Sequence, residues 1–322
     1  MSAIRAVALG GGHGLSATLR ALRFLTEDIT AVVTVADDGG SSGRLRDEFD
    51  ILPPGDLRMA LAALCEGTEW GRTWRDVLQH RFASSGPLAG HAVGNLLIAA
   101  LWDQLGDEVA GLDMVGRLLG AGGRVLPMSA IPLVIEAEVR EGQTGRTVRG
   151  QVTVASAHGA LSNVRLVPAS PPVRPEVTEA LGRADLIILG PGSWYTSVLP
   201  HLLVPELGAQ IRQAKARRMI VMNLSPQDAE TADLSPADHL QVLQDHDPEL
   251  TCDVVIADPL AVADPEELVA RTHQMGGRVL FRQVRSAERV DVHDPLRLAA
   301  AIRDAYEGSL GDVDTRENKE RP

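Results

Sequence analysis

The sequence predicts an α/β protein in which a mostly parallel sheet carries a β-rich insertion. Three observations favour this fold class. Continuous apolar runs occur at 4–9, 29–35 and 184–189, each run ends in a loop rich in glycine, serine or aspartate, and helical patterns separate the runs. Apolar runs without polar alternation are typical of strands that are buried on both faces of a parallel sheet.

The N-terminal half alternates strands with helices. Its predicted elements are a strand at 4–9, a glycine turn at 10–14, a helix at 15–25, a strand at 29–35 and several helices within 56–120. Asp56 is placed as the N-cap of the first of these later helices, because an aspartate side chain can accept the unpaired amides of a helix start.

The pattern changes at about residue 124. From there to about 168 the apolar and polar residues alternate, which predicts a β-rich insertion with antiparallel strands at 132–140, 147–155 and 163–167. The parallel rhythm then resumes with strands at 184–189, 218–222, 252–257 and 279–284, and a helix at 295–306 closes the fold. We therefore expect one domain over 1–310 and a polar, disordered tail over 311–322.

Composition excludes several function classes. Lys+Arg is 31 and Asp+Glu is 43, a net charge of −12, which argues against a nucleic-acid-binding surface. Only Lys215 and Lys319 are lysines, and no glycine-rich loop ends in Lys-Ser or Lys-Thr, so a Walker A P-loop is excluded. The two cysteines form no CxxC pair and no apolar run reaches the length of a membrane span, so we expect a reduced, cytoplasmic protein.

Two loops in the N-terminal half carry the first candidate binding residues. The run Gly10 to Gly14 lets backbone amides approach a phosphate at a helix N-terminus, and His13 could donate to it. The second loop carries Asp37, Asp38, Ser41 and Ser42, whose carboxylates could hold Mg²⁺, bind ribose hydroxyls or act as a general base. Ordinary tight turns remain the alternative for both loops.

Two further segments add polar groups. Asn95 precedes an apolar helical run, where a buried amide needs hydrogen-bonding partners, and Gly94 beside it indicates a close approach by a packed helix or a ligand. Gly192, Ser193 and Thr196 follow the strand at 184–189 in a tight loop near a helix start. In an open α/β sheet, loops at the carboxyl ends of the strands form the ligand site, so we expect these four segments to converge.

Together, these segments resemble the YvcK/CofD-like family. The resemblance covers about residues 4–310 and rests on GGGHGLSATLRAL, VTVADDGGSSGRLR, LPPGDLRMALAAL, GHAVGNLLIAAL, VLPMS and ADLIILGPGSWYTSVLPHLLVP, in that order. It implies a Rossmann-like three-layer α/β/α sandwich that binds a nucleotide. Carried onto this chain, the resemblance places the diphosphate of a UDP-sugar at Gly11, Gly12, His13 and Gly14. It also implies that four residues face the sugar or a metal, namely Asp37, Asp38, Ser41 and Ser42. The residues that it implies for the rest of the pocket are Asn95, Gly192, Ser193 and Thr196.

The resemblance implies two functions of different class. The gluconeogenesis-factor branch implies a nucleotide-sugar-binding regulator of cell shape and of growth on gluconeogenic carbon, without established turnover and with no fixed cofactor beyond its ligand. The phospholactate transferases imply a Mg²⁺-dependent transferase of phosphorus-containing groups, with Asp37 and Asp38 as metal-binding or catalytic candidates. The long motifs favour the regulator, and a homodimer is expected.

A third hypothesis comes from spacing alone. Gly12-x-Gly14-x-x-Ala17 fits the GxGxxA dinucleotide fingerprint, and Asp37 lies 20 residues beyond Ala17. That pattern would suit an NAD-binding oxidoreductase. No Ser-His-Asp order accompanies it, and no acid/base partner for hydride transfer stands out.

Overall fold

The computed structural model describes residues 4–141, 144–225, 231 and 234–308. Its main sheet has seven strands in the order β10-β9-β8-β7-β1-β2-β3, and every neighbouring pair is parallel. The bounds are β1 Ala6–Gly10, β2 Ile29–Val33, β3 Arg124–Pro127, β7 Leu186–Leu189, β8 Arg217–Val221, β9 Val254–Ala257 and β10 Arg278–Phe281. The predicted fold class, a Rossmann-like three-layer sandwich on a mostly parallel sheet, is confirmed.

The apolar runs form the centre of this sheet. Every residue of β1, β2, β7 and β9 is buried, as expected for strands covered by helices on both faces. Their side chains join one continuous hydrophobic core with the inner faces of the helices. The strand at 184–189 was predicted two residues too early, because Asp185 lies before β7 and pairs with Arg5 instead.

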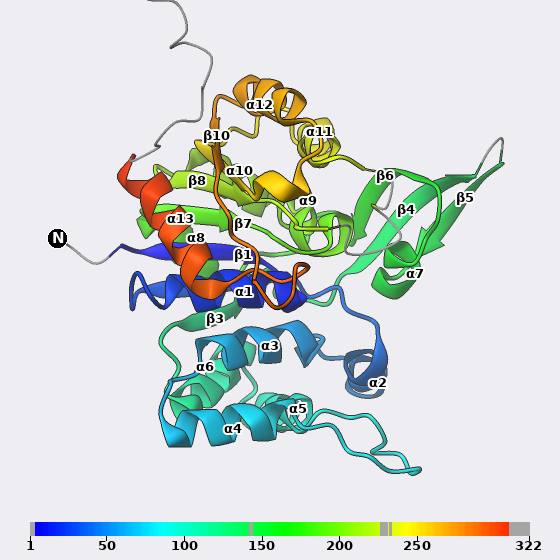
Figure 1. Cartoon of the computed structure of the whole chain (residues 1–322). Helices are drawn as coiled ribbons and strands as arrows, with labels where there is room; N and C mark the ends of the chain where they lie inside the picture. Colours follow the sequence, from blue (N-terminus) through cyan, green and yellow to red (C-terminus); the bar gives the residue numbers. More distant parts are fainter. Residues whose placement is uncertain (1–3, 142–143, 226–230, 232–233, 309–322) are drawn as a thin grey trace, which may run out of the picture.

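Helices cover the two faces of the sheet (Figure 1). On one face α1 contacts both α3 and α13, and on the other α8 contacts α10, which follows from right-handed crossovers running in opposite directions from β1. The helices are α1 Gly12–Leu22, α2 Gly40–Phe49, α3 Pro54–Leu64, α4 Glu69–Gln79, α5 Val93–Leu105, α6 Glu108–Leu119, α8 Pro175–Arg183, α9 Pro200–Leu203, α10 Pro205–Gln213, α11 Pro236–His246, α12 Pro265–Gln274 and α13 Pro295–Glu307. A π-helical turn, η1, spans Trp194–Val198, and a 3-10 turn, η3, spans Pro259–Ala261.

A small antiparallel sheet of order β5-β4-β6 projects from one end of the molecule (Figure 1). Its strands are β4 Val134–Glu141, β5 Thr144–Arg149 and β6 Ala160–Val167, and helix α7 spans Gln151–Ala155 between them. The structure differs from the sequence prediction in two respects. Arg124–Pro127 is β3, a parallel strand of the main sheet, and the expected strand 147–155 ends at Arg149.

The physical reason for helix α7 lies in two contacts. Gly150 adopts a φ of +96°, which turns the chain out of β5, and the Asp38 carboxylate accepts the backbone N–H of Val152 at 3.0 Å. A side-chain acceptor at a helix start stabilises the helix. Here this stabilisation outweighs the preference of Val152 and Val154 for a strand. The polar tail expected over 311–322 lies outside the described residues. Among the residues that are described, no helix is both long enough and apolar enough to cross a bilayer.

Candidate functional site

The site begins where the direction of strand succession reverses, between β1 and β7. The glycine loop after β1 and the loop after β7 touch here: a Cβ on Gly14 would lie 2.1 Å from the carbonyl oxygen of Pro191. Thr18 of α1 also donates its hydroxyl to the carbonyl of Gly190 at 2.9 Å. Only a residue without a side chain fits at position 14, and the two loops form one edge of the site.

Helix α1 starts at Gly12, and its N-terminus receives a side chain from another helix. The N-cap residue, Gly11, offers no side-chain acceptor, and Gly12 adopts a φ of +56°. The Asp56 carboxylate of α3 accepts a hydrogen bond from the backbone of Gly12. Asp56 therefore caps α1 rather than its own helix, because α3 already starts at Pro54 and Asp56 lies inside its first turn.

Asp56 forms a carboxylate pair with Asp37. Burial, and next the negative charge of Asp37, raise the pKa of the Asp56 carboxyl to about 7, against the opposing Gly12 amide and Arg58 charge. The buried Oδ2 atom of Asp56 has no hydrogen-bond partner in the part of the chain that the structure describes, and neither has the hydroxyl of Thr34. The Asp56 Oδ2 atom and the Thr34 methyl group both lie against the glycine loop, since a Cβ on Gly11 would lie 2.5 Å from Asp56 Oδ2 and 2.6 Å from Thr34 Cγ2.

Asp38 points away from this pair. Its Oδ1 atom accepts the N–H of Val152 at 3.0 Å, and a Cβ on Gly150 would lie 2.1 Å from its Oδ2 atom. The carboxylate thus ties the small sheet to the loop after β2. Asp37 acts electrostatically on Asp56, whereas the described contacts of the Asp38 side chain are with Gly150 and Val152.

Ser41, Ser42 and Asn95 are buried beside this loop. The Ser41 hydroxyl lies 3.0 Å from His91 Nδ1 and accepts the Asn95 amide at 3.0 Å, while Asn95 Oδ1 has no described partner. Ser42 lies next to α3, because a Cβ on Gly55 would be 2.3 Å from its hydroxyl and 3.0 Å from Asp37 Oδ2. This network fixes the second loop against α3 and α5.

The loop after β7 is held from the next strand. Asn223, which follows β8, accepts the N–H of Gly192 and donates to its carbonyl, both at 2.9 Å. The hydroxyls of Ser193 and Thr196 lie 2.5 Å apart within the turn that leads into η1. Asn223 therefore shapes the backbone of residue 192, a role that the sequence did not indicate.

A cavity of about 460 Å³ opens beside the two touching loops. Three of the residues predicted for the site line it, namely His13, Gly14 and Gly192, while the other nine do not. The remaining lining residues are Ser16, Ala17, Arg20, Met59, Gln79, Pro191, Asn223, Arg289, Asp291, Val292, His293 and Pro295. The cavity thus lies against α1; neither Asp37 nor Asp56 lines it, but Asp56 accepts from the backbone of Gly12, next to the lining residue His13.

One wall of the cavity is a loop that sequence reasoning missed. Between β10 and α13 the chain folds back on itself, with Ser286 donating its N–H to Val292 and Asp294 donating to Val284. The fully buried Asp258 anchors this loop through the N–H groups of Val284 and Arg285 at 2.9 and 3.1 Å and through the Arg285 side chain. The loop is polar and short, so neither helical nor strand periodicity marks it.

The charged side chains of the cavity wall are two arginines and one aspartate. Arg20 from α1, Arg289 from the loop before α13 and Asp291 line it, and Arg289 is 2.9 Å from Asp291. His13 adds an exposed imidazole at the start of α1. Guanidinium groups and a helix N-terminus are the usual partners of a phosphate.

The donor set next to the cavity fits Mg²⁺ in part. No group of three His, Cys, Asp or Glu side chains in the described ranges could hold a metal by itself. Asp37 and Asp56 provide hard carboxylate oxygen atoms, and the Oδ2 atom of Asp56 lacks a described partner. Mg²⁺ is usually held by one or two carboxylates together with water and substrate phosphates, and that is what this arrangement offers.

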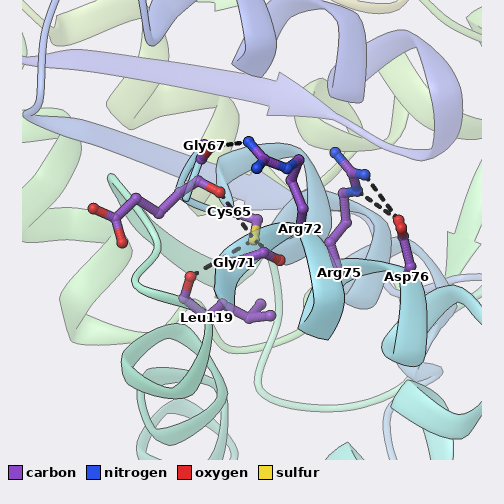
Figure 2. A network of polar contacts seen from close by, with 8 residues as sticks. Cys65, Gly67, Gly71, Arg72, Arg75, Asp76 and Leu119 are labelled. Carbon is purple, nitrogen blue, oxygen red and sulfur yellow. Dashed lines mark hydrogen bonds and ion pairs between the residues drawn. The ribbon is translucent and has the colours of Figure 1, made fainter. Parts of the chain in front are cut away.

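The cysteines lie outside the site. Cys65 follows α3, and its thiol donates to the Gly71 carbonyl at 2.8 Å and lies near the backbone carbonyls of Glu66 and Leu119 (Figure 2). Burial raises the pKa of the Cys65 thiol, and burial likewise raises that of Cys252 to about 12. Because the thiolate is the reactive form, burial keeps both cysteines in the unreactive thiol form.

Comparison with known proteins places this architecture in a family. The sequence profile described as 2-phospho-L-lactate transferase CofD matches residues 6–293. A protein of Mycobacterium tuberculosis named "Putative gluconeogenesis factor" is 50% identical over 303 residues, which cover 92% of this chain and 88% of that protein. The gluconeogenesis factor of Bacillus subtilis is 43% identical over 237 residues, which cover 74% of this chain and 73% of that protein.

A solved structure agrees with these relatives. A member of the UPF0052 family from Bacillus halodurans superimposes with a TM-score of 0.85 at 36% identity, covering 94% of this chain and 99% of that one. The match spans the parallel sheet and the loops described above. The chain therefore belongs to the CofD family, and within it to the branch whose members are named gluconeogenesis factors.

Proposed function

We propose that the protein binds a nucleoside diphosphate sugar, and specifically a UDP-sugar, as a regulator. The observation that carries this proposal is the cavity of about 460 Å³ at the switch point of the sheet, with the start of α1, Arg20 and Arg289 in its wall. Its size lies in the range of small-molecule sites, roughly 300–1,000 Å³. Its backbone amides and guanidinium groups suit a diphosphate, and Arg20 and Arg289 would offset part of that negative charge beside Asp291.

Mg²⁺ would accompany the ligand. A diphosphate near the start of α1 would face the carboxylates of Asp37 and Asp56, and this much negative charge in one place is unfavourable without a cation. Asp37 and Asp56 would hold the ion, which would supply charge neutralisation between the carboxylates and the phosphates. Asp38 is not part of this set, since its carboxylate contacts the start of α7.

A transferase is the second candidate. Two features favour it: the family is described as 2-phospho-L-lactate transferase, and the pKa of Asp56 is raised to about 7. A carboxylate with a pKa near the working pH can accept a proton from an attacking hydroxyl. In this reading Asp56 rather than Asp38 is the general-base candidate, and Asp37 helps to hold the cation.

Calorimetric titration with UDP-N-acetylglucosamine, with and without Mg²⁺, tests the proposal. We expect saturable binding that tightens when Mg²⁺ is present and that weakens at least about tenfold in Asp37→Ala, the size of loss typical for one charged contact. Unchanged affinity in Asp37→Ala would refute the role of that carboxylate. Parallel thermal-shift arms with GDP and NAD separate the UDP-sugar reading from the transferase and oxidoreductase readings.

The cellular part of the proposal needs a genetic test. If the protein is a regulator of cell shape, a deletion strain should grow abnormally on gluconeogenic carbon, and a variant that folds but does not bind UDP-sugars should fail to restore growth. Restoration by a non-binding variant would separate the cellular role from ligand binding.

A further inference from the structure

Arg58 of α3 is a buried cation without a carboxylate partner. Only 3% of its surface is exposed, yet it forms no ion pair with any carboxylate in the described part of the chain. Its NH1 group donates to the side-chain oxygen of Gln79, and its Nε atom is buried without a partner. Burying a charge is costly, so an unpaired buried guanidinium needs an explanation.

The protein makes room for this side chain at Gly94. A Cβ at position 94 would lie 2.8 Å from Arg58 Cδ and 2.9 Å from Arg58 Cγ. The same Cβ would lie 2.9 Å from the backbone oxygen of Leu78, so the glycine inside α5, which costs helix stability, is required both by the Arg58 stem and by the end of α4. The stem passes between α3 and α5, and its guanidinium reaches the last residue of α4, Gln79.

Gln79 connects this cation to the cavity. It is exposed, it lines the cavity together with Met59, and its Oε1 atom is occupied by Arg58. That bond fixes the orientation of the amide, so the Nε2 group becomes the available donor, and it has no partner among the described side chains.

The charge of Arg58 is balanced only at a distance. Asp37 and Asp56 act on it electrostatically, and Arg81 opposes them. Once a divalent cation neutralises the two carboxylates, as proposed above, no counter-charge remains for the guanidinium. The wall at Gln79 then favours an acceptor that carries negative charge.

We propose that Arg58 and Gln79 form a second anion-recognition wall of the cavity, which selects ligands carrying a carboxylate or phosphate in addition to the diphosphate. The inference rests on the proposed function, because it assumes that the diphosphate occupies the opposite wall at the start of α1. It narrows the ligand class to nucleoside diphosphate sugars that carry a further anionic group.

UDP-glucose and UDP-glucuronate provide a matched comparison, because they differ at one position only. UDP-glucose carries a hydroxymethyl group where UDP-glucuronate carries a carboxylate. In calorimetric titrations with Mg²⁺, we expect the wild-type protein to bind UDP-glucuronate about tenfold more tightly, as for one charge-assisted hydrogen bond. Gln79→Glu places a carboxylate next to Arg58 and should abolish the preference for UDP-glucuronate, measured as the ratio of the two affinities. Gln104→Glu, the same change at an exposed position of α5, should keep the preference.

The outcomes separate the two proposals. Equal affinity of the wild type for both sugars, or a preference that survives in Gln79→Glu, overturns the anion-recognition wall and leaves UDP-sugar binding intact. Failure of both sugars to bind refutes the proposed function and this inference together. Gly94→Ala, whose added Cβ would meet the Arg58 stem and the backbone oxygen of Leu78 beside Gln79, should also reduce the preference, and its melting curve checks that the variant is folded.

Discussion

Asp56→Asn should make the protein more stable and at the same time weaken its Mg²⁺ binding. The substitution removes a partly buried negative charge, while the asparagine oxygen can still accept the Gly12 amide at the start of α1. Stability and function conflict at this position, because the charge that destabilises the folded chain is the one that would hold the cation.

The magnitude follows from the pKa. Raising the Asp56 pKa from 3.8 to about 7 is worth about 4 kcal/mol above pH 7, at about 1.4 kcal/mol per pH unit. Relaxation around the neutral side chain reduces this ceiling, so we expect a gain of about 1–3 kcal/mol in the free energy of unfolding. For a chain of this length, that corresponds to an increase of about 2–6 °C in the melting temperature at pH 8.

The sign of the pH dependence distinguishes this effect from other causes of stabilisation. A carboxyl whose folded pKa is raised weakens the folded state above that pKa, and the penalty disappears as the pH falls toward 4. Three buried histidines, His201, His239 and His293, act in the opposite direction, since burial lowers the pKa of each to about 4 and stability is lost as the pH falls below 6.5. Between about pH 4 and pH 6.5, the three histidines take up protons on unfolding, whereas Asp56 releases one. Unfolding therefore takes up about two protons in the wild type and about three in Asp56→Asn.

Urea unfolding from pH 4.5 to 8 measures both quantities. We expect the variant to gain stability at pH 8, to lose this advantage near pH 4.5, and to show the steeper slope. Asp103→Asn, an exposed aspartate of α5, is the matched control and should leave the curve unchanged. A variant that is no more stable than the wild type at pH 8, or equally stabilised at both pH values, would refute the assignment of a strained Asp37–Asp56 pair.

The remaining predictions concern neighbouring contacts. Gly94→Ala should destabilise the protein by about 1–3 kcal/mol in urea unfolding, because the added Cβ meets the Arg58 stem, whereas Gly116→Ala, with no atom closer than 3.9 Å, should be neutral or stabilising. Equal effects of the two would contradict the packing. Asp38→Ala should cost about 0.5–2 kcal/mol and speed amide exchange at α7 while UDP-sugar affinity changes little, and a large loss of affinity would return Asp38 to the site. Mg²⁺ affinity should rise from pH 6 to pH 8, as Asp56 loses its proton, and a flat profile would exclude Asp56 as a ligand.

The sequence predicted the meeting of the two glycine loops because strand order and chain geometry decide it. Parallel strands end at one edge of the sheet, so the loops after β1 and β7 could be expected to touch, and Gly14 against Pro191 confirms this contact. The same argument could not identify the partner of Asp37. Asp56 is distant in sequence and had a complete local explanation as a helix cap, so nothing in the pattern indicated that it caps α1 instead.

Other features depend on contacts that no sequence pattern encodes. Adjacent residues of an extended loop point in different directions, which is why Asp37 faces the site and Asp38 faces α7. The loop before α13 is polar and lacks periodicity, yet it supplies a wall of the cavity through Arg289 and His293. Gln79 is the last residue of an exposed helix and belongs to no sequence motif. Only the hydrogen bond that it accepts from Arg58 identifies it as a candidate binding residue.

The most direct test of the account is a crystal structure of the protein with UDP-N-acetylglucosamine and Mg²⁺. We predict electron density for the diphosphate in the cavity between the start of α1 and Arg289, with the cation on Asp37 and Asp56. A nucleotide seated elsewhere on the protein, or a diphosphate turned away from the glycine loop, would contradict the central claim.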